Sequence, residues 1–285
     1  MSNYHLRFVE RLTGHDLEML ASLDQAPAGA GELRAILARE PGTVDLLLAD
    51  QSLYESLFED APSAMIPGVT PLLAFGVLVH RTKSDLASAT YVPEWIGAGE
   101  RLPVFDAASI REFIEDSARP YLIAELLTSF TKVASGATWV RTERGYRKRR
   151  YSELDPVALA EMVESLPMTR RSSGYRRLGE VSLFLTGVFP DHTARHPTSP
   201  MQRARLARLS GIEAADAGDL DYVHFLERVG RSWYDRAASD PLLPTGLHGV
   251  LCDMAENFPR ARRFLNYLTD RYLHRVDTGL MNPVG

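Results

Sequence analysis

Apolar residues recur at intervals of three and four along almost the whole chain, and this spacing restricts the fold more than any other feature. The segments HDLEMLASL, GELRAILARE and DPVALAEMVESL each show it, and Gly, Pro or Ala breaks separate such segments. Intervals of three and four place apolar side chains on one face of an α-helix. The sequence therefore predicts an all-α protein, a multi-helix bundle of about ten helices in one or two packed layers.

One predicted helix is apolar on nearly every side in its first half. In TPLLAFGVLVHRTKSDLASA, Thr70 is a good N-cap residue and Pro71 suits the first helical position. Because such a helix has no polar face for solvent, we expect it to be central, with His80 as a hydrogen-bonded core residue. Near the C-terminus, Pro259 interrupts a long helical pattern and predicts a kink or a division there.

The apolar period changes in ATWVRTERGYRKRRY. Residues rich in β-branched and aromatic types flank a short segment that ends in Gly145, the pattern of a β-hairpin with a bulge. We expect one inserted β-hairpin near residues 137–152 with a three-residue loop, 143–145. Arg141 would then face Arg147 directly, which costs stability unless an anion neutralises the pair. One face would carry Trp139, Arg141, Arg147 and Arg149, and the other Thr138, Val140, Lys148 and Arg150.

The same stretch concentrates positive charge. Six of the ten residues from Arg141 to Arg150 are cationic and Glu143 is acidic, a local charge of +5 in a chain of net charge −5. The remainder of the chain therefore carries −10. Such an asymmetry indicates a surface that attracts an anionic partner.

We expect a binding surface on this hairpin, with cations for phosphate groups and aromatic rings for base stacking. Its predicted members are Trp139, Arg141, Arg144, Tyr146, Arg147, Lys148, Arg149 and Arg150. Nucleic acid is the first partner that this chemistry suggests. Two alternatives stay open, namely a clamp on an acidic surface of the same protein or of a second subunit, and a site for a phosphorylated small ligand.

Length and composition restrict the class of protein. A chain of 285 residues suffices for one large domain or two ordinary ones. Its single cysteine, Cys252, excludes an intramolecular disulfide and suits a reducing cytoplasm. The longest strongly apolar run, PLLAFGVLV, is about half of what spans a bilayer. We expect a cytoplasmic protein with neither a secretory signal nor a membrane partner.

The segment from Tyr91 to Asp106 is rich in Gly and Pro and has the composition of a long loop, which predicts a boundary. We expect an N-terminal helical region at residues 1–104. A C-terminal helical region that includes the basic hairpin would follow at residues 105–285. Packing of both regions as a single domain is the alternative.

Catalytic and metal sites find little support. The chain has no G-x-S-x-G, Walker or G-x-G-x-x-G motif. Three pairs have ligand spacing, but the helical pattern places them opposite apolar stripes or in a short surface segment. These pairs are Asp221 with His224, Asp270 with His274, and His192 with His196. Cys252 lies on an apolar face and is expected to be buried and inert. We therefore assign no catalytic residue, metal or cofactor.

The sequence favours a non-catalytic binding or regulatory protein that engages an anionic partner, nucleic acid first, through the hairpin. One alternative is a small helical enzyme with a pocket under the 91–106 loop, using Glu94, Glu180 or His80. Another is an oligomeric adaptor in which the hairpin clamps an acidic protein surface. For Glu180, arginines three and four residues earlier favour a structural ion pair.

Overall fold

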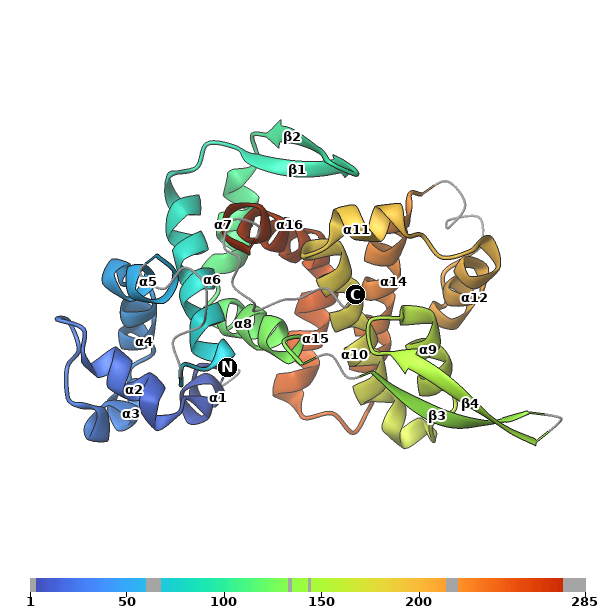
Figure 1. Ribbon diagram of the computed structural model, residues 1–285, viewed down its shortest axis with the longest axis horizontal. Coiled ribbons are helices and arrows are strands. Elements are labelled where there is room, and N and C mark those ends of the chain that lie inside the picture. Colours follow the sequence, from blue (N-terminus) through green and yellow to red (C-terminus); the bar gives the residue numbers. More distant parts are fainter. Residues whose placement is uncertain (1–3, 60–67, 133–134, 143–144, 214–219, 274–285) are drawn as a thin grey trace. The chain divides into compact units, whose positions relative to one another are not determined.

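The protein is mostly helical (Figure 1), in a computed structural model that describes residues 4–59, 68–132, 135–142, 145–213 and 220–273. For residues 135–142 and 145–151 the structure describes the backbone alone. The expected all-α class is confirmed, although these ranges hold fifteen α-helices where about ten were predicted. The chain forms two compact units, Met1–Glu94, Pro103–Thr131 and Phe264–Gly285 in the first, and Trp95–Leu102 and Lys132–Arg263 in the second.

The first unit is built from short helices around one long helix. Its helices are α1 (Tyr4–Arg11), α2 (Gly14–Ala21), α3 (Ala30–Arg39), α4 (Pro41–Leu48), α5 (Gln51–Phe58), α6 (Pro71–Ser88), α7 (Ala107–Glu115) and α8 (Arg119–Ser129). The later part of α16 (Phe258–Leu268) and the π-helix η1 (Thr269–Leu273) also belong to this unit.

Helix α6 is the centre of the first unit, as its apolar first half predicts. The side chain of Thr70 accepts a hydrogen bond from the backbone N–H of Leu73, and Pro71 follows in the first turn. Every residue from Leu72 to His80 is buried. At Gly76 a Cβ would lie 2.8 Å from the ring of Phe8, so the glycine lets α1 pack directly against α6.

The second unit contains the longest helix of the described ranges. Its elements are β3 (Ser135–Thr142), β4 (Gly145–Ser152), α9 (Pro156–Glu164), α10 (Met168–Gly187), α11 (Pro190–Arg195), α12 (Pro200–Ser210), α14 (Tyr222–Ala238), α15 (Thr245–Glu256) and the start of α16. The predicted division at Pro259 is confirmed, because α15 ends at Glu256 and α16 begins at Phe258.

Helices α10 and α14 pack against each other at close range. A Cβ on Gly230 would lie 2.5 Å from the ring of Phe258 and 2.8 Å from Ser182, and one on Gly179 would lie 3.0 Å from the ring of Tyr234. Because neither glycine has a side chain, the facing residues can pack directly against the helix backbone.

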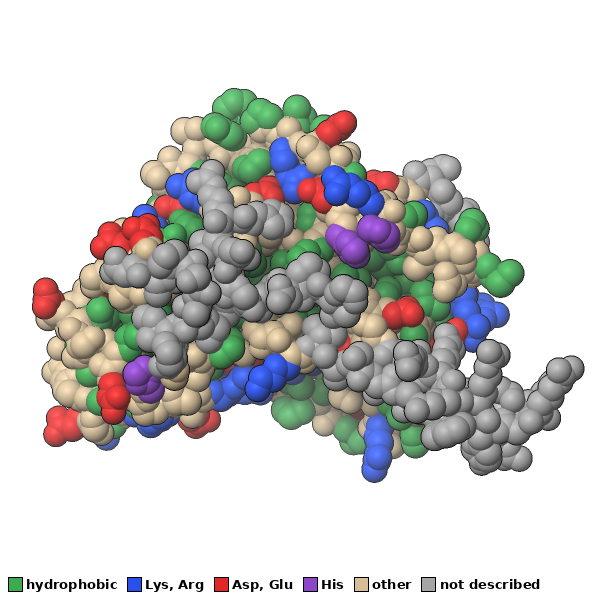
Figure 2. Space-filling view, in the orientation of Figure 1, with side chains coloured by type: hydrophobic (Ala, Val, Ile, Leu, Met, Phe, Trp, Pro, Cys, Tyr) green, Lys and Arg blue, Asp and Glu red, His purple; other side chains and the backbone are tan. Residues whose placement is uncertain are grey.

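The segment 91–106 is not a loop, and that prediction was wrong. Residues Val92–Gly97 form β1 and residues Glu100–Val104 form β2, hydrogen-bonded to each other as a two-stranded sheet. Gly99 has a φ of +82°, a conformation that lets the chain reverse within two residues. Both compact units take residues from this hairpin. Figure 2 shows hydrophobic side chains exposed over it, and Ile96, Leu102 and Phe105 are among them.

Asp191, at the start of α11, holds the tip of the β1–β2 hairpin. Its Oδ1 accepts hydrogen bonds from the indole of Trp95 at 2.8 Å and from the backbone N–H of Gly99 at 2.9 Å. Arg101 adds an ion pair at 3.2 Å. Asp191 lies about ninety residues after the hairpin in the sequence. The residue pattern of the strands alone therefore could not indicate these hydrogen bonds.

None of the helices within the described ranges combines the length and apolarity that crossing a membrane requires.

Candidate functional site

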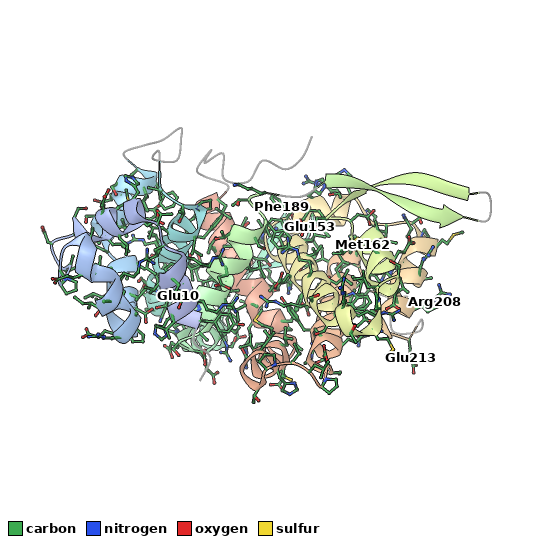
Figure 3. All side chains as sticks on the ribbon, turned by 90° about the horizontal axis from the view of Figure 1, so that it is seen from below. Glu10, Glu153, Met162, Phe189, Arg208 and Glu213 are labelled. Carbon is green, nitrogen blue, oxygen red and sulfur yellow. The ribbon has the colours of Figure 1, made fainter. Side chains whose placement is uncertain are left out.

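The basic hairpin exists, and its strands are longer than the sequence pattern indicated. β3 and β4 pair antiparallel over eight residue pairs, from Ser135 opposite Ser152 to Thr142 opposite Gly145. β4 packs against α9. In two perpendicular views the far end of the ladder reaches past the neighbouring helices (Figure 1, Figure 3). The hairpin is thus a projecting element of the second unit.

The pairing register differs by one residue from the prediction. Arg141 lies opposite Tyr146, and Arg147 lies opposite Val140, so the predicted Arg141–Arg147 opposition is wrong. The physical reason is that a two-residue connection suits the twist of paired strands, and this register also avoids two like charges facing each other. The costly pair that seemed to require an anion is therefore absent from the described ladder.

The observed register also redistributes the predicted site residues between the two faces. Residues opposite each other in an antiparallel pair share a face. One face carries Trp139, Arg141, Tyr146, Lys148 and Arg150, and the other carries Thr138, Val140, Arg147 and Arg149. Arg144 lies outside the described residues. Trp139, Tyr146 and three cations therefore belong to one face, which we call the aromatic–basic face, and Tyr151 lies on the other face.

Four carboxylates that follow the hairpin in the sequence have arginine partners. Glu153, labelled in Figure 3 with Met162 of α9, accepts from Arg177 at 2.6 Å. The other pairs are Glu161 with Arg205, Glu164 with Arg171, and Glu180 with Arg176 and Arg177. Each of these acids thus has an arginine partner outside the hairpin. The expected ion pair of Glu180 is confirmed, at 2.7 Å from Arg176.

The residues of the alternative enzyme site belong to three different elements. His80 is in α6 and Glu94 in β1, both in the first unit, whereas Glu180 is in α10 of the second unit. His80 is 2% exposed and both of its ring nitrogens are hydrogen-bonded, to Gly76 O and to Asp45 Oδ1, each at 2.9 Å. It is the core histidine that the sequence predicts, and it has no free nitrogen to act as a base.

A cavity of about 490 Å³ does lie beside residues 91–93. Among the residues that line it are Asp85, Tyr91, Tyr267 and Arg271. Arg271 pairs with Asp85 at 2.6 Å, and Tyr272 of the π-helix donates to the same carboxylate. Burial and this hydrogen bond raise the pKa of Tyr272 to about 12. Asp85 thus has two partners here, and the residues that line this cavity do not include the three proposed for catalysis.

The pairs with metal-ligand spacing serve local structure. Asp221 is the N-cap of α14 and accepts from the backbone N–H groups of Val223 and His224. The rings of His192 in α11 and of His196, which follows the helix, stack with centroids 4.3 Å apart. Across the described ranges no three His, Cys, Asp or Glu residues are grouped so that they could hold a metal ion. His274, the predicted partner of Asp270, lies outside those ranges.

The sequence analysis did not predict two groups of interacting side chains. Cys252 is half-buried rather than buried, and its Sγ lies 3.6 Å from Nε2 of His248, one helical turn earlier. That spacing of four was visible in the sequence. In the first unit, Asp45 joins His80 and Tyr121, which are 35 and 76 residues away along the chain. No local pattern could have paired them.

Comparison with protein-family models, with curated proteins and with solved structures gives no match for this chain.

Proposed function

We propose that this chain is a non-catalytic binding or regulatory protein that engages an anionic partner, nucleic acid first, through the β3–β4 hairpin. The single observation that carries the proposal is the backbone register. It puts Trp139 and Tyr146 on the same face as Arg141, Lys148 and Arg150. Flat aromatic rings beside cations are the combination that binds bases by stacking and phosphates by charge.

The shape of the element supports the same proposal. A ladder of eight residue pairs is about 27 Å long at ~3.4 Å per residue. One strand, β4, packs against α9, and the far end of the ladder extends past the neighbouring helices (Figure 1). A two-stranded ribbon of this kind can follow a phosphate backbone or enter a major groove.

The distribution of charge supports an anion from another molecule over an acidic surface of the same protein. The hairpin segment carries +5 against −10 for the rest of the chain. The nearby acids Glu153, Glu161, Glu164 and Glu180 each have an arginine partner outside the hairpin. These pairs favour an anion supplied by another molecule. An acidic protein surface, including that of a second subunit, is the competing source of that anion.

The test measures binding of a fluorescent single-stranded oligonucleotide by anisotropy at low salt. Lys148→Gln with Arg150→Gln removes two charges from the aromatic–basic face, and Arg147→Gln with Arg149→Gln removes two from the opposite face. We expect the first double variant to bind about tenfold or more weakly than wild type, and the second to retain most of its affinity.

Equal losses of affinity in the two double variants would indicate a nonspecific effect of charge. If the wild-type protein does not bind the oligonucleotide, the proposal is wrong. Polyglutamate added as competitor separates the two sources of the anion. Displacement of the oligonucleotide at equal charge concentration would favour an acidic protein partner over nucleic acid.

A further inference from the structure

A second cavity lies in the first unit, far in sequence from the basic hairpin. It is bounded by α4, α6 and α7 and has a volume of about 420 Å³, within the range of small-molecule sites. Its lining includes Asp45, Lys83 and Arg111 as charged groups and Leu46 and Ile114 as apolar ones. A few polar groups set in a largely apolar wall are typical of a ligand site.

Asp45 is held in one orientation from behind. Its Oδ1 accepts a hydrogen bond from Tyr121 at 2.7 Å and one from His80 at 2.9 Å. Both partners are almost fully buried, with exposures of 1% and 2%. Asp45 itself is 37% exposed. Two buried donors thus fix a carboxylate whose other oxygen, Oδ2, accepts no hydrogen bond from the described residues.

Two hydrogen bonds keep the Asp45 carboxyl ionised. Nδ1 of His80 lies 2.9 Å from the carbonyl oxygen of Gly76, and Nε2 lies 2.9 Å from Oδ1 of Asp45. Burial alone would raise the pKa of Asp45, but the hydrogen bonds from His80 and Tyr121 hold it below its usual value. Asp45 is therefore an ionised acceptor held by two buried side chains.

The cations at the cavity are poorly matched within the protein. Lys83 forms no hydrogen bond or ion pair with the described residues and acts on Asp45 only through its charge. Arg111 donates to the carbonyl oxygen of Ala87 and has no carboxylate partner among the described residues. Lys83 and Arg111 are thus two cations of the lining that pair with no carboxylate of the described residues. The cavity is therefore suited to a carboxylate.

We infer that the cavity bounded by α4, α6 and α7 binds a small carboxylic acid that has a hydrogen-bond donor on the neighbouring carbon and an apolar chain. The ligand carboxylate pairs with Lys83 and Arg111, its donor meets Oδ2 of Asp45, and the chain lies against Leu46 and Ile114. The donor is the ammonium of an α-amino acid or the hydroxyl of an α-hydroxy acid. This inference does not depend on the hairpin.

Four probes of nearly equal shape test it by calorimetry: L-leucine, 2-hydroxy-4-methylpentanoate, 4-methylpentanoate without the donor, and 3-methylbutylamine without the carboxylate. We expect at least one of the first two to bind with a Kd on the order of 1 mM or lower. The two incomplete probes should bind at least tenfold more weakly than that acid.

Two variants test which side chain contacts the donor of the ligand and which contacts its carboxylate. In Asp45→Asn the amide oxygen takes the bonds from His80 and Tyr121, which turns the NH₂ group toward the cavity in place of an acceptor. The advantage of the donor-bearing acid over 4-methylpentanoate should vanish. Lys83→Met leaves the Asp45 cluster intact and should weaken the acid at least tenfold, while the exposed Lys132→Met serves as a control of equal charge change.

Three results would overturn the inference. They are the absence of saturable binding of both donor-bearing acids up to about 10 mM, survival of the donor preference in Asp45→Asn, and equal effects of the Lys83 and Lys132 substitutions. Oligonucleotide binding by the hairpin would be unaffected by any of them, so the two proposals fail separately.

Discussion

Single carboxylates join distant parts of each unit. Asp16 is fully buried and accepts from the backbone N–H of Thr13 at 2.8 Å and that of Thr70 at 2.9 Å, so it caps α2 and α6 together. Asp191 does the same for the β1–β2 tip through Trp95 and Gly99. Charged acceptors of this kind contribute more than neutral ones because each donor they satisfy would otherwise be desolvated without a partner.

Asp191 gives the stability a defined dependence on pH. Burial raises the pKa of this carboxyl, but the hydrogen bonds from Gly99, Arg101 and Trp95 outweigh burial and lower it. A lowered pKa in the folded state means that the stabilisation is complete above about pH 4 and is lost as the pH falls through the folded value. Asp191→Asn should cost about 1–3 kcal/mol at pH 7 by urea unfolding. A deficit that does not shrink below pH 4 would contradict this role.

Two helical glycines form a matched pair for packing. A Cβ on Gly230 would lie 2.5 Å from Phe258, whereas one on Gly249 of α15 meets no atom within 4 Å. Gly230→Ala should therefore destabilise the protein by about 1–3 kcal/mol, and Gly249→Ala should stabilise it by about 0.5–1 kcal/mol. Thermal unfolding of the two variants measures both, and a stable Gly230→Ala protein would disprove the close contact of α10, α14 and α16.

At the scale of elements, the helices were predictable and the hairpins only in part. Thr70 and Pro71 begin α6 as expected, because capping depends on neighbouring residues alone. The β1–β2 hairpin was missed because Pro93 and the glycines around Ala98 interrupt the strand pattern. Its stability comes instead from Asp191, far along the chain. The Asp45 cluster was unpredictable for the same reason.

The register of β3–β4 was wrong because composition does not distinguish a loop of two residues from one of three. A disulfide test decides it in a Cys252→Ser background, which removes the single native thiol. Thr138→Cys with Arg149→Cys should cross-link under mild oxidation, since these residues are paired. Thr138→Cys with Arg150→Cys, the pair of the three-residue-loop register, should stay reduced because the two residues lie on opposite faces. Mass spectrometry reports both, and the reverse result would restore the original register.

At the scale of the whole molecule, the charge distribution governs how a polyanion could bind. Outside the segment 141–150 the chain carries −10 and repels a polyanion. We therefore expect a polyanion to contact the hairpin alone, with few phosphates neutralised. Composition already predicted this polarity, but it could not assign cations to faces, which required the observed pairing of Arg141 with Tyr146.

The salt dependence of oligonucleotide binding tests the central claim most directly. For a single strand, each phosphate contact contributes about 0.7 to the slope of log K against log salt concentration. Lys148→Gln with Arg150→Gln should lower the slope of the wild type by about 1.4, and Arg147→Gln with Arg149→Gln should leave it nearly unchanged. A slope that stays the same in the first double variant, or falls equally in both, would contradict binding through the aromatic–basic face.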